Sequence, residues 1–122
     1  MNPNRDHCEE NCSEEPGNRA LRDSLMDVAG LSELFKALAD ETRTRILYLL
    51  SQEELCVHSI AQVMEMSLPA VSHHLRLLKT MRLVSYRREG KHAYYRLNDD
   101  HVLELIQVAM DHYREGLEAS HG

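Results

Sequence analysis

The sequence predicts a mainly α fold with a small β-hairpin, an α+β domain in which short helices precede and follow the hairpin. Apolar residues recur at helical spacing from about residue 19, two short β-rich runs flank residue 90, and helical spacing resumes near residue 99. The chain has 122 residues, of which 43% are hydrophobic and 28% are charged. That size suits one domain with its own core and is too small for two.

The first part of the chain differs in character from the rest. Residues 1–18 are polar and acidic and are broken by a Pro-Gly pair, so we expect a flexible tail that carries Cys8 and Cys12. We expect a single domain at residues 19–122. Within it, helical spacing and cap residues predict four short helices. Three cover residues 19–29, 32–38 and 57–64, and another begins after Asp40 and includes Leu50.

A fifth predicted helix begins after Ser67 and extends to Thr80. Ser67 is a favourable N-cap residue, and Pro69 is tolerated because the first helical turn needs no amide donor. The apolar positions are spaced three and four apart and are expected to face the core: Leu68, Val71, Leu75 and Leu78. The side chains between them are therefore expected to face outward.

Two short strands follow this helix, and a long helix completes the domain. Residues 83–88 and 92–97 are separated by the turn residues Glu89, Gly90 and Lys91, which predicts a hairpin. Helical spacing then runs over residues 99–117. Two short helices joined by a tight turn and followed by a hairpin predict a winged helix-turn-helix.

The charge distribution favours a polyanionic partner. The net charge is −6, yet residues 76–96 hold seven Lys and Arg residues against the single acid Glu89, which leaves −12 on the remainder. A compact basic segment in an acidic protein is typical of nucleic-acid binding, and a basic hairpin that only faces solvent is the alternative. We expect double-stranded DNA to contact Ser67, Ala70, Ser72, His73, Arg76 and Lys79 on the helix and Arg87, Arg88 and Lys91 on the wing. We also assign His74 to this DNA-facing surface.

Several segments of the sequence follow one another in a pattern that is known from other proteins. Residues 37–43 read Ala-Leu-Ala-Asp-Glu-Thr-Arg, and the likeness continues through residues 46–47, 54–57, 70–75, 83–84 and 90–95. Together they resemble the ArsR/SmtB family of metal-sensing repressors over about residues 30–117, closest to its zinc-, cadmium- and lead-sensing branch. The resemblance implies a winged-helix homodimer that represses metal-efflux or metal-sequestration genes and leaves operator DNA on binding metal.

The final predicted helix contains two pairs of potential ligands, Asp99 with His101 and His112 with Glu115. Imidazole and carboxylate groups ligate Zn²⁺ tetrahedrally. His101 and His112 share a helix face but lie about 16 Å apart along the axis, so the pairs cannot meet within one chain. An antiparallel copy of the helix would join the two pairs, which predicts a homodimer with two equivalent sites. A solvated acidic helix with scattered histidines is the alternative, and the resemblance favours the metal site because all four positions match the family's helical zinc site.

A second candidate metal site uses all three cysteines and one histidine: Cys8, Cys12, Cys56 and His58. Residues two apart, such as Cys56 and His58, converge only where a helix begins irregularly. A Cys₃His set suits Cd²⁺, Zn²⁺ or Pb²⁺, but the family's cadmium- and lead-sensing branch has cysteine where this chain has His58, which disfavours lead. His7 is an alternative ligand, and free tail thiols with Cys56 packed as a small apolar side chain are the alternative to any site. We assign His92 to the wing.

The remaining expectations concern location and class of activity. A polar amino terminus and an odd number of cysteines favour a reduced, cytoplasmic protein, and apolar runs of only a few residues indicate no membrane partner. We expect no enzymatic activity, because the chain has no His-Glu-x-x-His motif and four helix-borne ligands would leave no open coordination position. The alternatives to a metal-responsive repressor are a thiol-redox-sensing repressor of the same fold and a cytosolic metal-buffering protein.

Overall fold

The structure, a computed structural model, describes residues 16–121 and the side chains of residues 17–119. The chain divides into two units, Met1–Glu33 and Leu34–Gly122. In the first unit, α1 (Pro16–Ser24) continues directly into the 3-10 helix η3 (Leu25–Val28).

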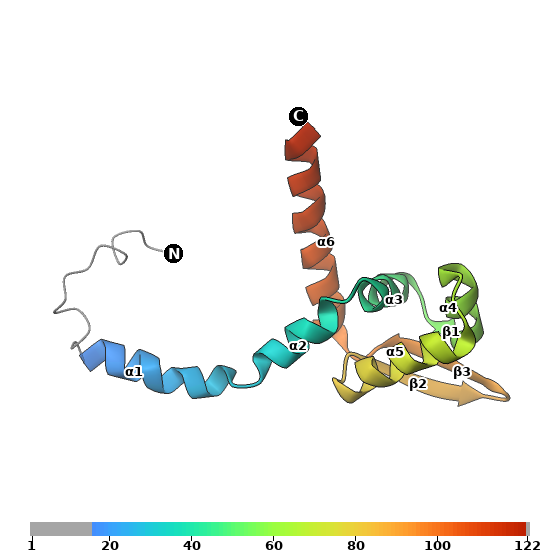
Figure 1. The fold of residues 1–122 in the computed structure, drawn as a ribbon, viewed down its shortest axis with the longest axis horizontal. Coiled ribbons are helices and arrows are strands. Elements are labelled where there is room, and N and C mark those ends of the chain that lie inside the picture. The colour runs from blue at the N-terminus through green and yellow to red at the C-terminus, as the bar shows by residue number, and fades with distance from the viewer. Residues whose placement is uncertain (1–15, 122) are drawn as a thin grey trace. The chain divides into compact units, whose positions relative to one another are not determined.

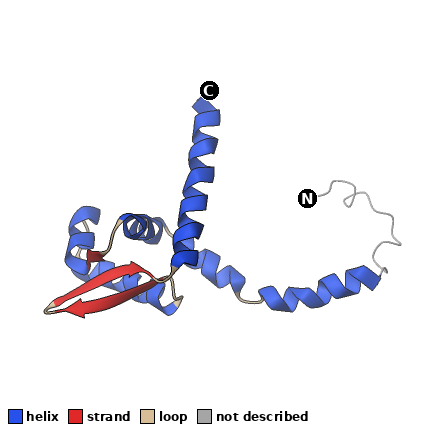
Figure 2. Ribbon diagram, turned by 180° about the vertical axis from the view of Figure 1, so that it is seen from behind, coloured by secondary structure: helices blue, strands red, loops and turns tan. Residues whose placement is uncertain are grey.

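The second unit contains the winged helix-turn-helix (Figure 1). Its elements follow in the order α2 (Leu31–Leu38, which begins in the first unit), α3 (Glu41–Gln52), β1 (Leu55–Cys56), α4 (Val57–Met64), α5 (Leu68–Thr80), β2 (Val84–Glu89), β3 (His92–Leu97) and α6 (Asp100–His121). Figure 2 shows β2 and β3 as a long hairpin and α6 leading away from it. The predicted mainly helical fold with a hairpin is therefore confirmed.

The hairpin is part of a three-stranded antiparallel sheet with the strand order β1-β3-β2. β2 and β3 pair from Val84 opposite Leu97 to Glu89 opposite His92. β1 pairs Cys56 with Tyr94. Sequence reasoning did not predict β1, because a strand of two residues is too short to show alternation of apolar and polar side chains.

The core lies between α3, α4, α5 and the inner face of the hairpin. Its largest fully buried side chains are Ile46, Leu47, Ile60, Val71, Leu75, Leu78 and Val84. α3 occupies the centre, since it packs against α5, α6 and β3. Leu68 is 37% exposed, so the prediction that it faces the core was wrong. It is the first residue of α5 and lies beyond the packed part of that helix.

Cap residues set several helix boundaries, and the start of the first helix and the end of the last helix differ most from those predicted. The side chains of Asp40 and Ser67 accept hydrogen bonds from the N–H groups of Arg43 and Ala70, as expected of N-caps. The first helix begins at Pro16 rather than near residue 19, because the fixed φ of proline suits a first helical turn. α6 extends to His121, four residues beyond the predicted end.

No helix in the described part of the chain combines the length and the apolar character that crossing a bilayer requires.

The cap of α3 yields a prediction for stability. Asp40→Ala removes the acceptor for the N–H of Arg43 and should lower the free energy of unfolding by about 1 kcal/mol, whereas Asp40→Asn should retain most of it. Urea denaturation with chelator at one protein concentration measures both variants. Equal losses in the two variants would show that the hydrogen bond is not the source of the stability.

The same residue predicts a pH dependence. The backbone N–H of Arg43 is the largest cause that holds the pKa of Asp40 below its ordinary value. Its contribution to stability is therefore present above the carboxyl's unfolded pKa and is lost as the pH falls through the lower folded pKa. In the Asp40→Asn variant, the free energy of unfolding should fall less steeply as the pH is lowered below about 4, the range in which an unfolded Asp titrates.

Candidate DNA interface and metal-binding residues

Helix α5 presents the residues predicted to contact DNA on the side away from the core. Val71, Leu75 and Leu78 are fully buried, so the helix has one fixed orientation. Ala70 and Ser72 are half-buried beside this apolar face. The exposed members of the predicted set are Ser67, His73, Arg76 and Lys79. Hydroxyl, imidazole and cationic groups along one helix face are suited to base edges and phosphates.

Aromatic residues join this helix to the wing. Tyr86 and Tyr95 lie opposite each other in β2 and β3, with ring centroids 5.2 Å apart. The Nζ of Lys79 lies 4.4 Å from the centre of the Tyr86 ring, and Arg88 approaches the same ring at 5.9 Å. Burial raises the pKa of Tyr95 above its ordinary value, so this phenol is neutral at physiological pH. The cation–π contacts hold basic groups of α5 and of the wing close together.

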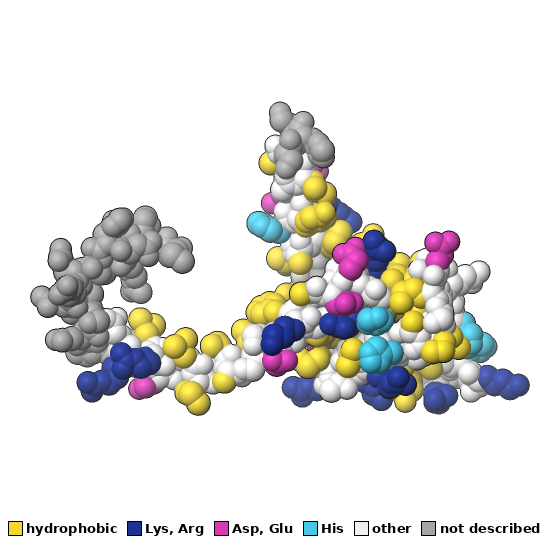
Figure 3. Space-filling model, viewed as in Figure 1, with side chains coloured by type: hydrophobic (Ala, Val, Ile, Leu, Met, Phe, Trp, Pro, Cys, Tyr) yellow, Lys and Arg dark blue, Asp and Glu magenta, His cyan; other side chains and the backbone are white. Residues whose placement is uncertain are grey.

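The basic side chains of helix and hairpin gather on one edge of the winged-helix unit. Figure 3 shows Lys and Arg side chains along the edge where α5 and the hairpin lie. Arg88 and Lys91 are exposed there, near the Gly90 turn. Arg87 has a further role, because its guanidinium donates to Oε1 of Glu54 at 2.7 Å and to Oε2 of Glu89 at 2.6 Å. The Arg87–Glu54 pair ties the hairpin to the segment before β1.

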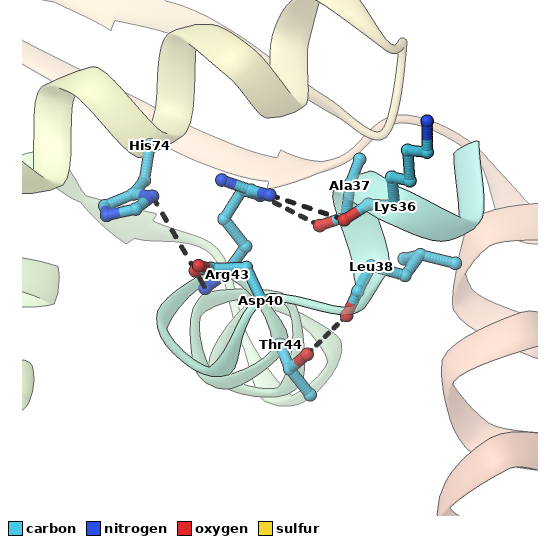
Figure 4. A network of polar contacts seen from close by, with 7 residues as sticks. All are labelled: Lys36, Ala37, Leu38, Asp40, Arg43, Thr44 and His74. Carbon is cyan, nitrogen blue, oxygen red and sulfur yellow. Dashed lines mark hydrogen bonds and ion pairs between the residues drawn. The ribbon is translucent and has the colours of Figure 1, made fainter. Parts of the chain in front are cut away.

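His74 faces α3, so its assignment to the DNA-facing surface was wrong. Its Nδ1 lies 3.9 Å from Oδ2 of Asp40, and its side chain is only 19% exposed. Figure 4 shows this contact beside the Arg43 guanidinium, whose Nε donates to the carbonyl of Ala37 at 2.9 Å. The contacts connect the end of α2, the start of α3 and the middle of α5. His74 follows the exposed His73 by one 100° helical step, which turns it toward α3.

Helix α6 carries three of the four predicted helical ligands, His101, His112 and Glu115, as exposed side chains on one uninterrupted helix. Asp99 precedes it, accepts a hydrogen bond from the N–H of Val102 at 3.0 Å and lies 3.7 Å from Nδ1 of His101. The hydrogen bond from Val102 lowers the pKa of Asp99, which favours the ionised carboxylate that a metal ion requires. Within the described residues of one chain the two ligand pairs do not form a cluster.

An exposed apolar stripe separates the two ligand pairs on α6. Leu105 and Val108 are 37% and 66% exposed. Residues 101, 105, 108 and 112 are spaced four, three and four apart, so they lie on one face of the helix. Both ligand pairs therefore border a surface that apolar contact with another molecule would stabilise.

The residues predicted for the second metal site fall into two groups. Cys8, Cys12 and His7 lie outside the described residues. Cys56 has an extended backbone and serves as the N-cap of α4, which gives the irregular helix start that its convergence with His58 requires. Hydrogen bonds from the side chain and backbone of Ser59 lower the pKa of the Cys56 thiol, and the Sγ–Oγ distance is 3.3 Å.

A third side chain joins this pair, and sequence reasoning assigned it to the wing alone. The ligand atoms of Cys56, His58 and His92 all lie within 4.8 Å of one another. The pairing of β1 with β3 places His92 there, so the overlooked strand is also the reason that His92 was overlooked. The signal available in the sequence was the Cys56-x-His58 pair together with a histidine, His92, at the start of a predicted strand.

Comparison with known proteins places these features in a family. The sequence profile described as "Bacterial regulatory protein, arsR family" matches residues 40–86, from the N-cap of α3 into β2. The cadmium resistance transcriptional regulatory protein CadC homolog of Staphylococcus aureus is 49% identical over 107 residues, which cover 84% of this chain and 86% of the relative. The transcriptional repressor SmtB homolog of Synechocystis sp. is 46% identical over 92 residues, which cover 75% of this chain and 70% of the relative.

A solved structure is similar to this chain in both fold and sequence. The solution structure of the homodimeric winged helix-turn-helix DNA-binding domain of Mb0332 from Mycobacterium bovis is 36% identical, with a TM-score of 0.67. The match covers 88% of this chain and 94% of that one. Both sequence relatives are named as transcriptional regulators rather than enzymes. This chain belongs to the arsR family of bacterial regulatory proteins.

Proposed function

We propose that this protein is a cytoplasmic, metal-responsive transcriptional repressor that binds operator DNA as a homodimer and is released by Zn²⁺ or Cd²⁺, with Pb²⁺ a weaker candidate. The names of its relatives, a cadmium resistance regulator and a transcriptional repressor, support this class of function. The homodimeric state of Mb0332 supports a dimer. The observation that carries the proposal is the arrangement of ligands on α6.

The geometry of α6 requires a second copy to complete a site. His101 and His112 are eleven residues apart on one continuous helix, a rise of about 16 Å, and their directions differ by only about 20°. In an antiparallel pair of α6 helices, each end of one helix meets the opposite end of the other. Asp99 and His101 of one protomer would then hold an ion together with His112 and Glu115 of its partner, at two symmetric sites.

The side chains between the ligands suit the same arrangement. Leu105 and Val108 would pack along the seam between the paired helices and lose their exposure to water. Two imidazoles and two carboxylates form a closed tetrahedral set that suits Zn²⁺. An ion bound there would fix the position of one α6 helix relative to the other. Within each chain, α3 packs against both α6 and α5.

Release from DNA requires two conformations of the dimer that differ in their affinity for the metal ion and for DNA. The conformation that closes the ligand pairs binds the ion better, and the conformation that aligns both α5 helices with successive major grooves binds DNA better. A typical coupling of about 1–3 kcal/mol corresponds to about 5–150-fold in affinity.

The direct test measures DNA affinity with and without the ion. Fluorescence anisotropy at fixed salt, with a labelled duplex from the region upstream of the gene, should show tight binding with chelator. Added Zn²⁺ or Cd²⁺ should weaken that binding at least about fivefold. An affinity that is the same with either ion and with chelator would reject the proposed regulation.

The basic side chains of the wing should make the affinity for DNA depend on salt concentration. Lys91→Ala or Arg88→Ala should weaken binding to specific and unrelated duplexes alike and should reduce the salt slope by about 1, because each removes a phosphate-directed cation. Ser72→Ala is the matched control: it should reduce discrimination between duplexes and leave the salt slope unchanged. An unchanged slope in both wing variants would contradict their role.

A mixed dimer tests the assembly of the α6 site in trans. In chains that also carry Cys56→Ser, one His101→Ala protomer is paired with one His112→Ala protomer. Both defects then fall in the same site, and the symmetry-related site is intact. The mixed dimer should retain one tightly bound Zn²⁺, and either mutant homodimer should retain none there. Equal zinc loss in all three dimers would show that the four residues do not meet across the interface.

A further inference from the structure

Three potential metal ligands converge where β1 meets α4. The ligand atoms of Cys56, His58 and His92 lie within 4.8 Å of one another, and no other group of three or more such residues converges in the described part of the chain. Neighbouring ligand atoms around a tetrahedral zinc ion lie about 3.5 Å apart, given bond lengths of about 2.0–2.3 Å. Closing the cluster around an ion therefore requires only about 1 Å of side-chain movement.

The backbone explains why these three side chains meet. Cys56 lies opposite Tyr94 in the β1–β3 pair, so the two side chains share one face of the sheet. His92 is two residues before Tyr94 and therefore lies on that same face. His58 is in the first turn of α4, two residues after Cys56, and its ring centroid lies 5.8 Å from that of His92.

The chemistry of the cluster suits a borderline or soft divalent cation. One thiolate and two neutral imidazoles favour Zn²⁺, Co²⁺ or Cd²⁺ over oxygen-preferring ions. The hydroxyl of Ser59, 3.3 Å from Sγ of Cys56, provides a hydrogen-bonding neighbour of the kind that orients metal ligands. A fourth coordination position remains for water or for a further protein ligand.

We propose that His92 ligates the same divalent cation as Cys56 and His58, so that this three-residue site crosslinks the wing to the start of α4 without the tail cysteines. The proposal deepens the proposed function and rests on it only for the regulatory consequence. Lys91, which is expected to contact phosphate, is adjacent to His92 in the chain. A cation bound to His92 therefore fixes the part of the wing that DNA must accommodate.

The ion pair that joins the hairpin to the segment before β1 adds only a little to the restraint from the β1–β3 pairing. Arg87 reaches Glu54 at 2.7 Å, but the guanidinium side chain is 52% exposed, and exposed ion pairs contribute little to stability. Coordination bonds hold protein segments together far more strongly. Occupancy by a cation would thus change the mobility of the wing more than the existing ion pair does.

Cobalt titration tests the role of His92 without DNA. The parent is the full-length chain with Cys8→Ser, Cys12→Ser and His101→Ala, which removes the tail thiols and one histidine ligand of the α6 site. It should bind Co²⁺ with a thiolate charge-transfer band and two paramagnetically shifted imidazole N–H signals. His92→Ala should weaken Co²⁺ binding by at least about tenfold, because even second-shell changes cost that much, and should leave one shifted imidazole signal. His73→Ala, which removes an exposed imidazole from α5, should match the parent.

The outcomes separate this proposal from the proposed function. Unchanged Co²⁺ affinity and two shifted imidazole signals in His92→Ala would overturn the role of His92, as would the absence of a thiolate band in the parent. Operator release by Zn²⁺ is measured separately on the unmodified chain. Failure of that release, with Co²⁺ binding as expected here, would reject the proposed regulation and leave the ligand assignment intact.

Discussion

Helix α3 packs against both α5 and α6. Structural coupling between the DNA-facing side of α5 and the candidate metal ligands of α6 depends on this shared packing. Ile46 and Leu47 of α3 are fully buried, and Val102 of α6 joins the same core. At the start of α3, Asp40 lies 3.9 Å from His74 of α5. Because close-packed interiors shift as units rather than deform gradually, a change in the setting of α6 has a direct mechanical path to α5.

The two candidate metal sites would act on different elements. The ligands of α6 are oxygen and nitrogen atoms, and they would fix the relation between two protomers. The cluster around Cys56 includes sulfur and would fix the wing within one protomer. Softer ions should therefore favour the Cys56 cluster, and zinc suits both. The acidic character of the rest of the chain leaves the basic edge formed by α5 and the hairpin as the preferred surface for a polyanion.

Sequence reasoning predicted most of the fold because its signals are local. Asp40 and Ser67 mark helix starts, and the spacing of Val71, Leu75 and Leu78 fixes the outward face of α5. Contacts between segments distant in the chain were not predictable in this way. The strand β1 has only two residues and shows no periodicity, so the sequence could not predict that His92 lies close to Cys56. His74 was misassigned because only the packing of α5 on α3 decides which side of that helix it occupies.

If the proposed function is correct, zinc binding and DNA binding oppose each other in one dimer. Thermodynamic linkage makes this claim testable from the metal side, because DNA must lower the affinity for zinc by the same factor by which zinc lowers the affinity for DNA. Competition with a chromophoric chelator measures the zinc affinity of the free protein and of the operator complex at one salt concentration. Zinc binding should be weaker in the operator complex than in the free protein, by the same factor by which zinc weakens DNA binding. Equal zinc affinities in the two states would contradict the proposed function.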